Sequence, residues 1–148
     1  MPASQANSGY GGTFSVDPAA GSPPNYVQML EVKSIKPANF AVTPLDVSHL
    51  LSPNNTEEFI PSMVRPGTIA MSGNYIGDTT QLAVTTTADA RTIVPWKITA
   101  PVQKNSKTYT ATGLGFWTKW EVGPIEPNKP IEWSGEFQMT GFVTEVVA

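Results

Sequence analysis

Few residues of this chain have the types and spacing that catalysis needs. His49 is the single histidine among 148 residues, and the chain contains no cysteine. Thiolate nucleophiles and zinc–thiolate sites need cysteine, and a histidine base needs a partner that orients it. His49 stands beside Leu50 and Leu51 in a polar stretch with no obvious partner. We therefore predict that the protein is not an enzyme and that it uses no metal or cofactor.

Acidic residues near the C-terminus are the next candidates for chemistry. Glu132 and Glu136 alternate with apolar residues, so both lie on one face of a predicted strand. Four residues of strand separate them by about 13 Å, whereas the carboxylate pair of a glycosidase needs ~5–9.5 Å. A solvated polar face explains the pattern better. Its members are Glu132, Ser134, Glu136, Gln138 and Thr140.

Four tryptophans could form a platform that stacks on sugars. Trp133 falls on the apolar face of its strand, and Trp117 and Trp120 are predicted on opposite faces of theirs. Core packing therefore explains at least two of the four. A carbohydrate-binding or adhesin β-sandwich with an exposed aromatic patch remains an alternative.

Charge and hydropathy exclude two further classes of protein. Charged residues make up 14% of the chain, the net charge is −3 and the pI is about 5.0. A protein that grips DNA needs a basic surface that neutralises phosphates. No apolar run approaches the ~18 residues of a membrane-spanning helix, so we expect no membrane insertion by this chain.

The first 24 residues differ in composition from the rest. Glycine, proline, serine and alanine dominate them, and Asp17 is their only charge. Such a segment buries too little apolar surface to offset its ordering entropy. We predict that residues 1–24 are a flexible N-terminal arm, with Tyr10, Phe14 and Val16 among its contacts, that becomes ordered on assembly. Residues 25–148 then form the folded domain.

The remaining sequence is mostly typical of β-strands. Residues 59–65 and 68–76 are predicted to form a hairpin around Pro66 and Gly67. Asp78 followed by Gln81 is typical of a helix N-cap and predicts one short helix over residues 78–90. Strands are also predicted over residues 27–35, 40–47, 91–98, 107–122 and 131–143. The fold class is all-β with one short helix, an antiparallel β-sandwich or barrel.

Two neighbouring stretches resemble a known family. The residues Glu57-Glu58-Phe59-Ile60-Pro61-Ser62-Met63, and then Pro66-Gly67-Thr68-Ile69-Ala70-Met71-Ser72-Gly73-Asn74-Tyr75, resemble the major tail tube protein of long, non-contractile-tailed bacteriophages. The short helix, the strand Val94-Pro95-Trp96-Lys97-Ile98 and the ending Phe137-Gln138-Met139-Thr140-Gly141 follow in the order of that family. Ser62 departs from it, because a glycine is common there.

The resemblance implies a structural virion protein. Hexameric rings, in which strands of each subunit join a continuous inner β-barrel, would stack into the tail tube that conducts double-stranded DNA during ejection without binding it specifically. Implied partners are further copies of the chain and the tape measure, baseplate and tail terminator proteins. The implied location is the phage tail, assembled in the bacterial host cytoplasm. A single-ring tail-completion or baseplate protein of the same fold is a second alternative.

Within that framework two surfaces acquire roles. The polar face from Glu132 to Thr140 is expected to line the channel, where few phosphate-binding cations would leave DNA mobile. The loop over residues 48–58 is too long and too apolar to be an idle connector, so we expect it to contact the next ring or the adjacent subunit. Its candidate contacts are His49, Leu50, Leu51, Asn54, Asn55 and Glu57.

Overall fold

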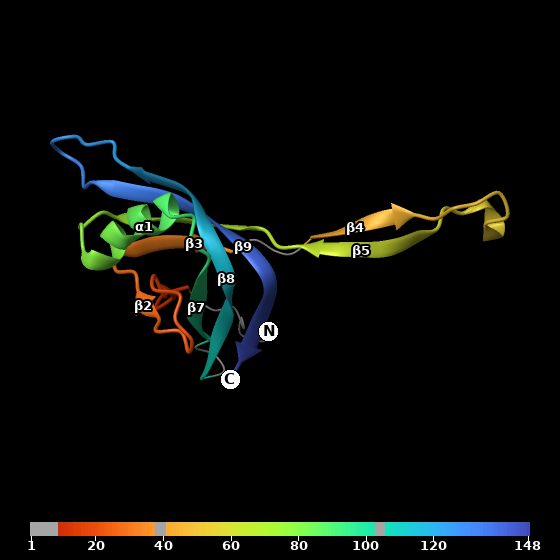
Figure 1. The fold of residues 1–148 in the computed structure, drawn as a ribbon, viewed down its shortest axis with the longest axis horizontal. Helices are drawn as coiled ribbons and strands as arrows, with labels where there is room; N and C mark the ends of the chain where they lie inside the picture. The colour runs from red at the N-terminus through yellow and green to blue at the C-terminus, as the bar shows by residue number, and fades with distance from the viewer. Residues whose placement is uncertain (1–8, 38–40, 103–105) are drawn as a thin grey trace, which may run out of the picture.

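A single curled antiparallel sheet forms most of the structure. The computed structural model describes residues 9–37, 41–102 and 106–148. Seven strands lie in the order β2-β1-β7-β8-β9-β6-β3 and curl into a half-barrel (Figure 1). The strands are β1 (Thr13–Val16), β2 (Val27–Gln28), β3 (Val32–Lys36), β6 (Thr68–Asn74), β7 (Val94–Val102), β8 (Lys107–Val122) and β9 (Glu132–Val147). The predicted all-β class with one helix is confirmed.

A separate hairpin extends away from this sheet. It consists of β4 (Ala41–Asp46) and β5 (Phe59–Arg65), with the 3-10 turn η1 (Pro53–Asn55) at its tip (Figure 1). The predicted hairpin of residues 59–65 with 68–76 is therefore wrong, because β5 pairs with β4 while β6 pairs with β3 and β9. Pro66 and Gly67, between β5 and β6, do not close a hairpin turn. Their carbonyls accept hydrogen bonds from β9, which fixes this segment to the sheet.

The core lies on one side of the sheet and is built largely from aromatic rings. Phe14 packs edge-on against Trp117 and Phe137, with ring centroids 6.1 and 5.8 Å apart. Glycines leave room for these rings: a Cβ on Gly115 would lie 2.3 Å from Phe137 Cε1 and 2.5 Å from the Gln138 carbonyl. A larger residue there would force backbone apart, so the close approach requires glycine.

A bulge changes the predicted placement of two tryptophans. The pairing of β8 with β9 shifts between Trp117 and Lys119, which makes Thr118 an extra residue. Trp117 and Trp120 consequently face the same side, 5.6 Å apart, and not opposite sides. Trp120 in turn stacks on Trp133 at 4.8 Å. With Trp96 also buried, none of the four forms an exposed platform, and the sugar-binding alternative loses its sequence support.

Part of the N-terminal segment belongs to the core of the same chain. β1 pairs with β7, and Phe14 and Val16 are 0% and 4% exposed. This differs from the expected arm, because two alternating apolar residues suffice to anchor a strand on an existing sheet. Tyr10 is exposed. Residues 1–8 of the predicted arm lie outside the described residues.

Asp17 explains how the segment after β1 is organised. Its buried carboxylate accepts hydrogen bonds from the backbone N–H groups of Ala19 at 3.0 Å, Gly21 at 2.8 Å and Asn25 at 3.2 Å. Burial raises the pKa of Asp17, but the three donors together outweigh it and hold the pKa below its usual value. The chain thereby turns back to place β2 beside β1.

The helix α1 (Thr79–Asp89) packs at one end of the sheet (Figure 1). Asp78 caps it as predicted, accepting from the Gln81 N–H at 2.9 Å. The buried Gln81 side chain accepts from Ile76 and Gly77 and donates to Asn74, so it fixes the link from β6 to the helix. The inward face consists of Thr80, Val84 and Thr87, whereas Leu82 is 57% exposed.

Candidate functional site

Three surfaces remain after the core is accounted for: a polar face of the sheet, a projecting hairpin and a groove between them. Among the described residues no group of three or more His, Asp or Glu side chains could hold a metal ion. No helix in the described ranges is long and apolar enough to cross a membrane.

The polar face is carried mainly by β9. Glu132, Ser134 and Glu136 are exposed, and Gln138 and Thr140 are half-buried. The residues between them, Trp133, Gly135, Phe137 and Met139, are buried. The alternation in the sequence thus places all five predicted residues on the side of the sheet away from the core.

Lysines of neighbouring strands share this face. Lys33 of β3 forms an ion pair with Glu132. Lys119 of β8 lies opposite Glu136 in register and 3.7 Å from Glu121. Both lysines lie outside the run around Glu132, Lys33 on the distant strand β3 and Lys119 on the preceding strand β8, so that run alone gave no sign of them. The face is polar and mildly acidic, because its two lysines stand beside three glutamates, Glu121, Glu132 and Glu136.

The hairpin of β4 and β5 has no buried residue. Its two strands carry Leu45 opposite Ile60 on one side and Val42 opposite Val64 on the other. All four are at least 40% exposed, as are Phe59 and Met63. A two-stranded hairpin with neither face covered is marginally stable in water. Its apolar side chains need a surface to pack against.

The tip of the hairpin has a defined internal structure. His49 accepts from the Leu51 N–H through Nδ1 at 3.2 Å, and its Nε2 lies 3.5 Å from Glu58 Oε2. Ser52 Oγ donates to the same carboxylate at 2.8 Å. This network turns Leu50 and Leu51 outward, where they are 103% and 86% exposed. The partner of His49 that the sequence did not reveal is Glu58.

The other predicted loop residues have distinct positions. Asn54 and Asn55 take positive φ values of 56° and 54° in the 3-10 turn, a conformation that asparagine tolerates well. Glu57 is exposed and forms no ion pair with any residue that the structure describes. The structure therefore gathers all six predicted loop residues at one end of the hairpin.

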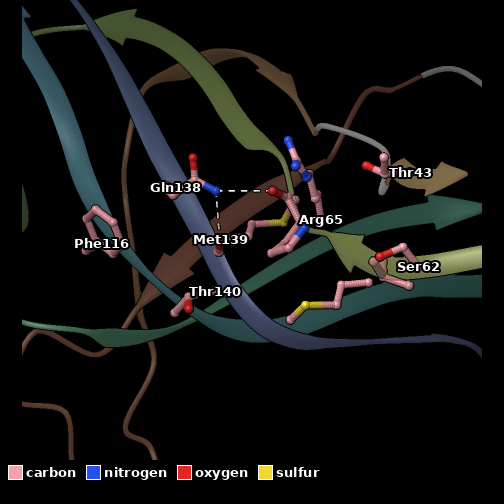
Figure 2. A pocket seen from close by; sticks show the side chains of 10 residues that line it. Thr43, Ser62, Arg65, Phe116, Gln138, Met139 and Thr140 are labelled. Atoms are coloured by element: carbon pink, nitrogen blue, oxygen red, sulfur yellow. Dashed lines mark hydrogen bonds between the residues drawn. The ribbon is translucent and has the colours of Figure 1, made fainter. Parts of the chain in front are cut away.

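A groove of about 540 Å³ lies where the hairpin leaves the sheet. Figure 2 shows Phe116 of β8 with Gln138, Met139 and Thr140 of β9 on one side, and Ser62 and Arg65 of β5 with Thr43 of β4 on the other. Gln138 Nε2 donates to the Pro66 carbonyl at 3.2 Å and thereby holds the segment between β5 and β6 beside β9. Local sequence patterns do not predict this groove, because its walls come from four strands.

Both long strands have a half that pairs on one side only. β7 pairs with β8 up to Gly115, and β6 pairs with β9 up to Gln138. Within the described ranges, β8 from Phe116 onward therefore pairs only with the first half of β9, and β9 from Thr140 onward pairs only with the first half of β8. Open edges of this kind invite pairing with another chain.

Comparisons with known proteins identify the class of fold. A chain from the tail of an empty gene transfer agent particle with C6 symmetry has a TM-score of 0.75 at 11% identity, covering 95% of this chain and 99% of that one. A chain from the tube-terminating cap of the anti-feeding prophage has a TM-score of 0.70 at 10% identity, covering 100% and 95%. No family model and no curated protein matches the sequence.

A third similar structure is that of a tail tube. The SPP1 tail tube chain has a TM-score of 0.61 at 13% identity, covering 92% of this chain and 75% of that one. The chain therefore has the fold seen in the tail and tube structures of phage-like particles and injection systems.

Proposed function

We propose that this protein is a structural subunit of a phage tail tube. In this proposal it forms hexameric rings that stack into the tube of a long, non-contractile tail and conduct DNA during ejection. The observation that carries the proposal is the hairpin of β4 and β5, in which every residue is exposed although many are apolar. Such an element is stable when a neighbouring subunit covers it.

Ring closure would use the open halves of β8 and β9. Pairing these edges between subunits would satisfy their backbone groups and continue the curled sheet around a central axis. The tail with C6 symmetry, to which this chain is structurally similar, supports a sixfold ring. A head-to-tail contact of this type leaves unlike surfaces above and below, which permits stacking.

The polar face would then line the channel. Glu132 is neutralised by Lys33, and Lys119 stands opposite Glu136, so the face offers DNA few unpaired cations. Phosphate binding by free cations releases counterions and strengthens attachment, and a face whose lysines stand beside carboxylates avoids that. Double-stranded DNA could pass such a wall without being held.

The remaining parts of the proposal follow from this role. Partners would be further copies of the chain and the tape measure, baseplate and tail terminator proteins. The site of action would be the virion tail, after assembly in the bacterial host cytoplasm.

One observation favours a second candidate, a protein that forms a single terminating ring. The chain covers 95% of a chain from the tube-terminating cap of the anti-feeding prophage and is itself covered completely. Such a protein would close a tube and would not extend it.

Electron microscopy of the purified chain distinguishes these functions. A tube subunit is expected to form hollow filaments with sixfold end views, and a terminating protein isolated rings. Met63→Asp together with Val64→Asp, on the exposed hairpin, should abolish either assembly, whereas Leu82→Asp on the exposed face of α1 should not. Compact monomers of the unaltered chain at all concentrations would exclude both functions.

A further inference from the structure

The groove beside the root of the hairpin has a shape and lining that need an occupant. Its volume of about 540 Å³ falls within the ~300–1,000 Å³ of pockets that enclose multi-atom ligands. Apolar atoms come from Met63, Val64, Phe116 and Met139, and Met63 is 81% exposed. An apolar hollow of this size is suited to aliphatic side chains.

The tip of the hairpin supplies side chains of that kind. Leu50 and Leu51 are the most exposed adjacent pair of large apolar residues among those described, and the hydrogen bonds around His49 hold the loop that presents them. A fixed apolar projection loses little conformational entropy when it enters a hollow.

The tip and the groove of one chain cannot meet. The groove is lined by Arg65 and Pro66 at the root of the hairpin, whereas Leu50 and Leu51 lie in the loop that joins β4 to β5. Figure 1 shows this loop at the end of the hairpin far from the sheet. The seven residues of β5 alone span about 20 Å at ~3.3 Å per residue. A paired, extended hairpin does not fold back over that distance, so a tip that fills the groove comes from another copy.

Charges at the two ends are also complementary. Asp46, Glu57 and Glu58 make the tip acidic. Arg65 stands on the wall of the groove and forms no ion pair with any residue in the described ranges. An arriving tip would bring carboxylates to this guanidinium, the pairing that arginine favours.

We propose that Leu50 and Leu51 of one copy insert into the groove of a second copy, with Glu57 near Arg65. The contact joins two different surfaces, so it repeats from copy to copy and does not close on a pair. This proposal rests on the self-association in the proposed function and specifies which surface receives the hairpin.

Cross-linking between two single-cysteine variants tests the contact, since the chain has no cysteine of its own. Leu51→Cys chains and Met63→Cys chains are mixed, allowed to assemble and treated with a short bismaleimide. The proposal expects covalent pairs that join position 51 of one variant to position 63 of the other. The control mixture pairs Leu51→Cys with Ile125→Cys, which is 77% exposed in the turn between β8 and β9, and should give none.

A charge exchange gives a second test that does not depend on cysteine placement within the groove. Arg65→Glu should lower the yield of assembled protein by about two- to fivefold, as expected for an exposed ion pair of ~0.4–1 kcal/mol. Adding Glu57→Arg to the same chain should restore it, most clearly at low salt. Failure of the double variant to recover would contradict the placement of Glu57 beside Arg65.

Microscopy of the same mixtures separates this proposal from the proposed function. Tubes without the cross-link between positions 51 and 63 would overturn the docking of the tip and leave the tube function standing. Cross-linked chains without rings or tubes would support the docking and overturn the function. If neither the cross-link nor any ring or tube formed, both the docking of the tip and the tube function would be overturned.

Discussion

Phe14 provides the sharpest test of whether the N-terminal strand belongs to the monomer. Its side chain is completely buried and contacts the rings of Trp117 and Phe137. Phe14→Ala removes the ring and leaves a cavity, and such changes cost about 3–5 kcal/mol. That is a large share of the ~5–15 kcal/mol by which domains are stable, so we expect a weakly folded monomer.

The assay is urea unfolding of dilute protein, followed by tryptophan fluorescence, so that assembly does not add stability. For a chain of this length the loss corresponds to a fall in Tm of about 6–20 °C. Phe142→Ala is the matched control, because Phe142 is 87% exposed and the same change there should alter stability by at most ~0.5 kcal/mol. Equal effects of the two substitutions would refute the reasoning and favour a loose arm.

Three further predictions concern charge and assembly. Asp17→Asn should destabilise the monomer at neutral pH. Because the pKa of Asp17 is lowered in the folded state, its stabilising contribution is present above the unfolded pKa of ~3.9 and is lost as pH falls through the folded value. Urea unfolding should therefore show the stability difference between variant and wild type shrinking below about pH 4. Leu50→Asp with Leu51→Asp should leave monomer stability within ~0.5 kcal/mol but prevent assembly, as sedimentation would show. Glu132→Lys with Glu136→Lys should leave tubes intact yet make them retain duplex DNA, most at low salt.

Each of these has its own control. A difference for Asp17→Asn that is unchanged between pH 7 and pH 3 would mean that the backbone donors do not favour the ionised carboxylate. Assembly of the double leucine variant at wild-type concentration would remove the tip from the interface. Asp89→Lys with Glu126→Lys makes the same change in net charge away from the polar face, and equal DNA retention by that variant would contradict a channel lining.

Local sequence patterns predicted several elements correctly. The alternation from Trp133 to Met139 defined which side of β9 is buried, because a strand places successive side chains on opposite faces. Asp78 marked the start of α1, because its carboxylate accepts the Gln81 N–H of the first turn. Asp78 itself lies only four residues after the end of the preceding strand. Both features depend on neighbours in the sequence.

The errors concern properties that local patterns do not contain. Strand β5 could pair with the strand before it or after it, and hydrogen bonds from β9 to Pro66 and Gly67 decided between them. Thr118 reversed the face of Trp120 because one extra residue shifts a strand by half its period. The lysine that neutralises Glu132 lies 99 residues away in the chain. Among the candidate site residues, Phe14 and Val16 are buried in the core, and the sequence could not identify the groove, whose walls come from four strands.

The stacked pair of Trp120 and Trp133 has an optical consequence. Two indole rings with centroids 4.8 Å apart and planes inclined by 25° have strongly coupled electronic transitions. Such a pair should produce a near-ultraviolet circular dichroism signal that vanishes when specific packing is lost, even where secondary structure persists. The native chain thus contains its own chromophore for following the closing of β8 onto β9, with no dye or label attached.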